Sequence, residues 1–238
     1  MKKLFLSIAF LLVTFIWVGA QRIIHDPFVE PRSIENFHAV DVSSGIDLYL
    51  SGGDEAIAVS GGSPEYTANI RTVVTKGVLK IWYDDNNNRV INNNKIALKV
   101  YLSYKSLDAI TASSGSDVLV DGTLSVPSLA INISSGSDFK GKVSINDLKI
   151  KQSSGADVAI EGTVVNLSIE ISSGSDLNGY GLESQNCSVS ASGGSTVKIR
   201  ATKTITATVS GGSDVLYKGD ATLSRKKSVG SSVKKVSR

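Results

Sequence analysis

Five aspartates recur at nearly constant spacing, and they are the residues of this chain best suited to chemistry. Each follows a Ser-Ser-Gly-Ser-like stretch, with a threonine where a sixth would fall: Asp117, Asp138, Asp157, Asp176, Thr196 and Asp214. Carboxylate oxygens are ligands that Ca²⁺ prefers, so a calcium row along these side chains is one expectation. The other is a solvated column, because calcium-binding β-rolls repeat a different, nine-residue glycine motif. We expect no metal and no cofactor, and keep Ca²⁺ as the alternative.

Catalytic residues are not expected. A serine or cysteine nucleophile needs a base, usually histidine, and the chain has only His25 and His38. The one cysteine, Cys187, falls in a column otherwise filled by leucine and isoleucine, which is typical of a small core residue. The loop that begins at Asp84 starts like an EF-hand but has Arg89 where that motif requires glycine. The sequence therefore predicts no catalytic site.

A glycine at the centre of each repeat indicates how the aspartates are positioned. The spacings are 21, 19, 19, 20 and 18 residues along Gly115, Gly136, Gly155, Gly174, Gly194 and Gly212. An earlier copy, "SSGIDLYL", centres on Gly45, and a weaker copy, "SVGSSV", centres on Gly230. Glycine reaches the positive φ angles of tight corners, and Ser and Asp side chains can bond the backbone groups that a corner leaves free. We interpret each repeat as a corner between two strands.

The residues flanking each corner alternate between apolar and polar types, as half-buried strands do. Three columns are apolar in nearly every repeat, and around Gly155 their members are Leu148, Ile150 and Val158. One repeat cannot bury such a face alone, whereas stacked repeats place equivalent side chains about 4.8 Å apart. The period is half of what a propeller blade requires. The sequence predicts an all-β fold, a parallel β-helix with one coil of about 19 residues per repeat.

The chain divides into segments that differ in regularity. We expect a β-helix domain over residues 37–222, made of an irregular cap half (37–105) with a short helix and of regular coils (106–222). Residues 21–36 form an N-terminal leader, and residues 223–238 form a basic C-terminal coil or tail. A cap is expected because the end strand of a stacked fold has unpaired backbone groups.

Residues 1–20 are typical of a Sec-type signal peptide. "MKK" precedes the apolar run "LFLSIAFLLVTFIWV", and small residues follow it, so cleavage is expected after Ala20. The run is shorter than a membrane span requires. We expect an exported protein in the periplasm, on the cell surface or secreted, which does not span a membrane once the signal is cleaved.

Charge is unevenly distributed along the chain. Residues 21–224 hold 22 acidic and 17 basic residues, whereas the last fourteen residues hold six basic residues and no acid. A nucleic-acid-binding protein concentrates basic residues on its folded body, so no nucleic-acid partner is expected. We interpret the basic tail as a solvated end, with adhesion to anionic lipid or polysaccharide as the alternative.

Several segments together resemble a known family. The signal peptide, "FHAVDVSSGIDLYL", "VLKIWY" and the serial "SSGSDVLVDG", "SSGSDFKG", "SSGADVAIEG" and "SGGSDVLYKG" are similar to the family described as "putative auto-transporter adhesin, head GIN domain". The resemblance covers about residues 37–222. It implies a right-handed β-helix in a secreted or envelope protein, chiefly of Bacteroidetes-type bacteria, without an established activity or active site.

The sequence leaves three functions open, in order of preference. The first is a non-enzymatic binding or adhesion module that presents polar ladders to a glycan or protein ligand at the cell envelope. The second is a structural or envelope-stress protein with only protein partners. The third is a polysaccharide lyase or hydrolase, which parallel β-helices also support.

Overall fold

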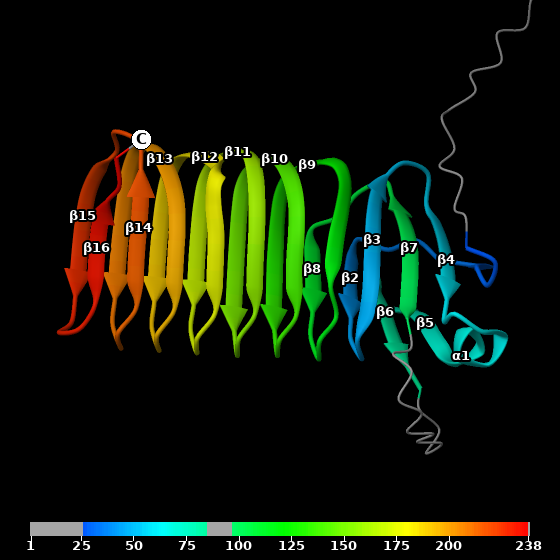
Figure 1. Ribbon diagram of the computed structural model, residues 1–238. Coiled ribbons are helices and arrows are strands. Elements are labelled where there is room, and N and C mark those ends of the chain that lie inside the picture. Colours follow the sequence, from blue (N-terminus) through cyan, green and yellow to red (C-terminus); the bar gives the residue numbers. More distant parts are fainter. Residues whose placement is uncertain (1–25, 85–96, 238) are drawn as a thin grey trace, which may run out of the picture.

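The protein is a solenoid of coils stacked along one axis, seen in the computed structural model in Figure 1. The structure describes residues 26–84 and 97–237. Several predicted features lie outside the described residues. They are the signal peptide with its cleavage site at Ala20, the start of the leader with His25, and the part of the EF-hand-like loop that follows Asp84. The predicted all-β parallel β-helix, with about 19 residues per coil, is confirmed.

The described residues form sixteen strands and one short helix. In chain order they are β1 (Glu30–Arg32), β2 (Ala39–Val42), β3 (Ile46–Gly52), β4 (Ala56–Ser60), α1 (Pro64–Asn69), β5 (Ile70–Thr75), β6 (Val78–Tyr83), β7 (Leu98–Tyr104), β8 (Ala109–Ala112), β9 (Val118–Ser134), β10 (Asp138–Ser153), β11 (Asp157–Ile171), β12 (Asp176–Ala191), β13 (Thr196–Val209), β14 (Asp214–Lys218), β15 (Thr222–Lys227) and β16 (Ser232–Lys235). Among residues 26–84 and 97–237, no helix has the length and apolar content needed to cross a membrane.

Each regular coil is one long strand that bends around the core. Along β10, buried and exposed residues alternate until Asn146 and Asp147, two neighbours that both point outward. A second irregularity lies at Gly141, which is only half-buried between the exposed Lys140 and Lys142. These two positions divide the outside of the coil into three surfaces. We name them the Asp face (138–142), the groove side (143–146) and the Asn face (147–153), and use the same names for equivalent residues of other coils.

The apolar columns stack in register and form the core. Leu148 pairs with Leu129 on one side and Leu167 on the other, and Ile150 lies between two further isoleucines. All these side chains are buried. Because each column repeats one residue type, every coil buries its apolar side against the next, and the backbone hydrogen bonds run between coils.

The corners combine two successive residues with positive φ. In the coil at Gly136, Ser135 has φ +57° and Gly136 has φ +68°. The seven corner glycines considered above (Gly45, Gly115, Gly136, Gly155, Gly174, Gly194 and Gly212) all have φ between +68° and +76°. A Cβ at any of them would meet no atom within 4 Å, so the backbone angle, and not crowding, favours glycine.

The residue after each corner glycine forms a buried hydrogen-bonded ladder. The backbone N–H of Ser116 donates to Ser137 Oγ at 3.0 Å, and that of Ser195 donates to Ser213 Oγ at 3.1 Å. These serines are at most 1% exposed. The serine after the corner glycine therefore satisfies a backbone donor inside the solenoid, which a buried polar group requires.

The first copy of the repeat is stacked with the others, out of sequence order. β2 pairs with both β6 and β8, and β3 pairs with both β7 and β9, all in parallel. The β2–β3 coil thus lies between coils that follow it in the chain. Its Gly45 N–H donates to Ser114 O at 3.0 Å, so this corner joins the column of the regular corners.

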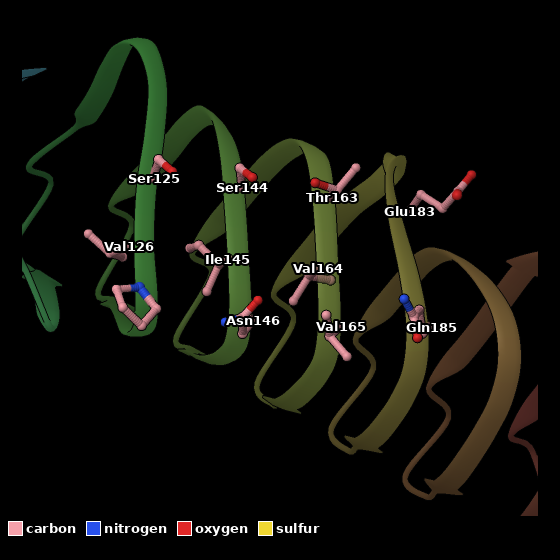
Figure 2. Close-up of a pocket in the computed structure, with 11 residues that line it drawn as sticks. Ser125, Val126, Ser144, Ile145, Asn146, Thr163, Val164, Val165, Glu183 and Gln185 are labelled. Carbon is pink, nitrogen blue, oxygen red and sulfur yellow. The ribbon is translucent and has the colours of Figure 1, made fainter.

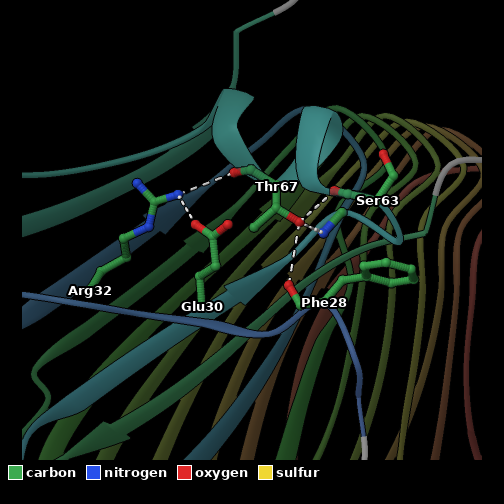
Figure 3. Close-up of polar contacts among 6 residues, drawn as sticks. Phe28, Glu30, Arg32, Ser63 and Thr67 are labelled. Carbon is green, nitrogen blue, oxygen red and sulfur yellow. Dashed lines mark hydrogen bonds and ion pairs between the residues drawn. The ribbon is translucent and has the colours of Figure 1, made fainter.

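The cap end stops the parallel stack with antiparallel strands. β4 pairs with β7, β1 with β4, and β5 with β6, all antiparallel. The predicted short helix is α1, whose N-cap Ser63 accepts from Tyr66 N–H. Figure 3 shows how the buried Thr67 joins this helix to the leader: its Oγ1 donates to Ser63 O at 2.7 Å and Phe28 O at 3.4 Å, while Arg32 donates to Thr67 O at 3.3 Å.

Candidate functional site

The predicted aspartate column lies on the Asp face, with its members in adjacent coils. Asp138 pairs with Asp157, and Asp157 with Asp176. The Asp138 N–H donates to Asp117 Oδ1 at 3.3 Å. Thr196 interrupts the row, and Asp214 follows it. The structure therefore brings four of the five predicted aspartates together and separates the fifth from them by one threonine.

A further aspartate, which the sequence analysis did not place, joins the column. Leu48 pairs with Val118, so Asp47 lies beside Asp117 in the adjacent coil. On its other side Asp47 pairs with Lys99. The sequence did contain the signal, because Asp47 occupies the aspartate position of the early copy "SSGID". Its partner could not be known without the stacking order of the cap half.

The carboxylates of this column are held in an environment that disfavours their charged form. Partial burial is the main cause that raises the pKa of Asp47, Asp117, Asp138 and Asp157. For the last three, the carboxylate of an adjacent coil raises the pKa further. Lys99 opposes the rise at Asp47, and backbone N–H groups oppose it at the others. A ligand that donates hydrogen bonds or carries positive charge would relieve this repulsion.

The aspartate column does not form a preassembled metal site. Among the residues that the structure describes, no group of three or more His, Cys, Asp or Glu side chains gathers so that it could hold a metal ion. The expectation that the column holds no metal, with calcium as the alternative, stays a prediction. A melting temperature that is unchanged in millimolar calcium would exclude calcium binding.

Two tyrosines lie on the Asp face directly beside this column. Tyr49 and Tyr101 pair across β3 and β7, with ring centroids 5.2 Å apart and ring planes 19° apart. Tyr49 is two residues beyond Asp47 on the same side of the strand. On the far side Tyr101 pairs with Ala58. The sequence analysis did not predict this pair, because 52 residues of chain separate its members.

Shallow grooves continue the Asp face away from the tyrosines. One groove of about 520 Å³ is lined by Leu119, Lys140, Asn178 and neighbouring small residues, including Gly141. A smaller one of about 300 Å³ runs beside Asp138, Asp157 and Asp176. Tyr49 pairs with Leu119, and Leu119 with Lys140, so the tyrosine pair and the first groove form one continuous surface.

The Asn face carries a second polar row, which is internally hydrogen-bonded. Asn166 Nδ2 donates to Asp147 Oδ1 at 2.8 Å, Asn186 Nδ2 to Asn166 Oδ1 at 3.0 Å, and Thr204 Oγ1 to Asn186 Oδ1 at 3.0 Å. Each of these groups already uses one hydrogen bond within the row. This row therefore offers a ligand fewer free polar groups than the aspartates do.

The groove side is shown in Figure 2. Its groove of about 540 Å³ is lined by hydroxyl residues such as Ser144 and Thr163, by aliphatic residues such as Ile145 and Val164, and by Gln185. Ile145 and Val164 are themselves almost fully buried. The surface has no aromatic ring and a single carboxylate among its lining residues, so it is less suited to a specific polar ligand than the Asp face.

Two residues are of types that enzymes often use in catalysis. His38 Nδ1 lies 3.0 Å from Asp108 Oδ1, and this carboxylate raises the pKa of the histidine. Cys187 is 4% exposed in its aliphatic column, and burial raises the pKa of its thiol to about 12. A thiol with so high a pKa is a poor nucleophile at neutral pH.

Solved structures with the same fold come from Bacteroides and Parabacteroides species. A "putative adhesin" from Bacteroides fragilis has a TM-score of 0.78 and 19% identity, over 88% of this chain and 96% of that one. A "putative adhesin" from Parabacteroides distasonis has a TM-score of 0.70 and 18% identity, over 87% and 96%. A "putative lipid binding protein" from the same species has a TM-score of 0.67 and 17% identity, over 89% and 98%.

These three structures support the β-helix fold of this chain. Two of the three are described as adhesins. No curated protein matches the chain in sequence. The profile of the family described as "Putative auto-transporter adhesin, head GIN domain" matches residues 36–221, which is most of the chain. With the stacked corners and columns described above, this match shows that the chain belongs to the head GIN domain family of adhesin-like proteins.

Proposed function

We propose that this protein is an exported, non-enzymatic adhesion module that binds a glycan along its Asp face at the cell envelope. The observation that best supports the proposal is the Tyr49–Tyr101 pair beside the Asp47 carboxylate. The family and the solved structures are described as adhesins, which agrees with a binding role.

The chemistry of this surface suits a sugar chain. Tyrosine gives a large apolar area with a polar tip, which packs against the C–H face of a sugar ring and hydrogen-bonds its hydroxyls. The neighbouring carboxylates accept hydrogen bonds from hydroxyl groups, and such charge-assisted bonds are stronger than neutral ones. Coils repeat about every 4.8 Å, a distance comparable to the length of one sugar unit in an extended polysaccharide. A repeating ligand could therefore present equivalent groups to successive coils.

The same carboxylates are poorly arranged for hydrolysis. A glycosidase needs two carboxyl groups whose environments drive their pKa values apart, so that one is an acid and the other a base or nucleophile. In this column the pKa of each of Asp47, Asp117, Asp138 and Asp157 shifts in the same direction. The arrangement favours binding over catalysis. Release of reducing ends or unsaturated products from a bound polysaccharide would contradict this part of the proposal.

The main experiment is a glycan array with the full chain after signal removal. We expect binding to a subset of extended polysaccharides. Tyr101→Ala should weaken it about tenfold or more, because the stacking surface is lost. Tyr83→Ala is the matched control, since Tyr83 lies on β6, which pairs with β2 and β5 and not with a strand of the Asp face. Silence across the array, or equal binding by Tyr101→Ala, would refute glycan adhesion and leave a structural role with protein partners.

A further inference from the structure

The last coil places basic side chains where the other coils place buried apolar ones. On β15, Arg225 pairs with Ala207 and Lys227 pairs with Val209, both of which are buried. On β16, Lys235 likewise pairs with a buried tyrosine. Three inward columns therefore end in cations at this end of the solenoid, while two others end in Leu223 and Val233. We call the five basic residues of this coil the cationic end face: Arg225, Lys226, Lys227, Lys234 and Lys235.

The cations of this end face are exposed and only partly neutralised. All five side chains are exposed. Lys235 bonds Asp220 at 3.0 Å, and Arg225 donates to the backbone oxygen of Val233 at 3.1 Å. The other three make no ion pair within residues 26–84 and 97–237. Positive charge is thus concentrated at one end of a protein whose body is otherwise acidic.

An exposed apolar residue stands at the corner between the two basic strands. Val229 is 100% exposed and takes the position that serine or glycine holds in the other corners. The corner is tied to the stack, because Ser228 N–H donates to Val209 O at 3.0 Å. A fixed apolar tip flanked by lysines matches the interface of a bilayer, where apolar groups enter the headgroup region and cations meet lipid phosphates.

We propose that the cationic end face docks the solenoid end-on against an anionic lipid bilayer. A single charged residue is enough to stop a strand edge from pairing with another chain, so protection of the edge does not explain five cations and an apolar tip. All of these groups belong to the last coil, at one end of the axis, and Arg225, Lys227 and Lys235 continue inward columns, so they face the open end that a flat bilayer would meet. End-on docking would leave the Asp face free and project the cap end away from the membrane (Figure 1).

Vesicle co-sedimentation of the full chain after signal removal tests the proposal. We expect binding to phosphatidylcholine vesicles that contain phosphatidylglycerol in roughly a 3:1 ratio, little binding to pure phosphatidylcholine, and loss of binding at about 0.5 M NaCl. The variant Lys226→Glu/Lys227→Glu/Lys234→Glu should bind at least about 100-fold more weakly. Glutamate keeps the strand edge charged, so the edge stays protected.

A matched control separates the end face from net charge. Lys80→Glu/Lys105→Glu/Lys203→Glu makes the same change in charge at exposed positions elsewhere and should bind anionic vesicles far more tightly than the end-face variant does. Thermal melting verifies that both variants fold. The proposal is overturned if wild-type protein does not distinguish the two vesicle types, if both variants lose binding equally, or if dextran sulfate is bound while vesicles are not. Because the glycan array reads a different surface, its failure would not affect this result.

Discussion

Replacing Asp138 by asparagine should stabilise the protein, although it removes a charged residue from a regular coil. Asp138 lies between Asp117 and Asp157, both carboxylates in adjacent coils. Asparagine has nearly the same shape, and its Oδ1 can still accept the hydrogen bond that the Asp157 N–H gives to this side chain. The change therefore removes repulsion and keeps the local bonding.

The size of the effect follows from the coil spacing and the exposure of the site. Two unit charges about 4.8 Å apart repel by roughly 0.9 kcal/mol in water and by about 3.5 kcal/mol at an effective dielectric of 20. Asp138 is exposed, so the aqueous value is the relevant one. With two such neighbours, we expect the free energy of unfolding to rise by about 1–2 kcal/mol. For a chain of this size, that corresponds to about 3–6 °C in Tm.

The assay is urea denaturation with Asp214→Asn as the matched control. Asp214 belongs to the same column, but its neighbours are Thr196 and Ser232, and the Ser232 hydroxyl donates to it. This control loses no repulsion, so its stability should be unchanged or slightly lower. Equal stabilisation by both variants, or no stabilisation by Asp138→Asn, would refute the reasoning.

The pH and salt dependence give a second check on the same variant. The folded state raises the pKa of Asp138, so its favourable contribution is full below the unfolded-state pKa near about 3.9. The contribution is lost as pH rises through the higher folded value. The advantage of Asp138→Asn should therefore grow from acidic to neutral pH and shrink in about 1 M salt. An advantage independent of both would show that charge is not its cause.

Three further predictions concern other sites. Gln152 and Ala156 replace the aliphatic residue and serine of most coils; the Gln152 Nε2 donates to Ala156 O and Asp176 O, but its buried Oε1 has no partner among the described residues. Gln152→Ile/Ala156→Ser should raise the unfolding free energy by about 1 kcal/mol in urea, and a loss would contradict this. NMR titration should give His38 a pKa above 6.5, and this pKa should fall in Asp108→Asn. The contribution of the His38–Asp108 pair to the free energy of unfolding should be full below the unfolded-state pKa of the histidine and should disappear as pH rises through its folded-state pKa. Gly162→Ala should cost at least about 2 kcal/mol by thermal melting, because φ is +116° and a Cβ would lie 1.9 Å from a carbonyl oxygen; a near-neutral effect would refute that reasoning.

The stacked part of the fold was predictable because its residue types repeat. A column such as Leu129, Leu148 and Leu167 can be aligned by counting, and the register of the strands follows the same alignment. The cap half lacks that period. Its β2–β3 coil is inserted between coils formed later in the chain, which depends on pairings between distant segments that local residue patterns do not encode.

The candidate site was predictable to the same extent and for the same reason. The repeating aspartates could be assigned to one column, since each follows a corner glycine. Tyr49 and Tyr101 could not be paired, because one belongs to the displaced coil and the other to a strand without a corner motif. The part of the Asp face that is chemically distinctive therefore lies where the repeat is weakest.

Repulsion between the carboxylates of the aspartate column lowers the stability of this solenoid. The fold accepts uncharged residues at this position, since Thr196 and Ser232 occupy it in two coils. Five successive carboxylates beside a tyrosine pair, from Asp47 to Asp176, are thus not required by the coil geometry. If the Asp face binds glycans, Asp138→Asn should gain stability and lose affinity together, whereas a variant that gains stability and keeps full affinity would mean that the column serves some other ligand or none. Measuring stability and affinity on this one variant therefore distinguishes a binding surface from a repeated feature of the fold that binds no ligand.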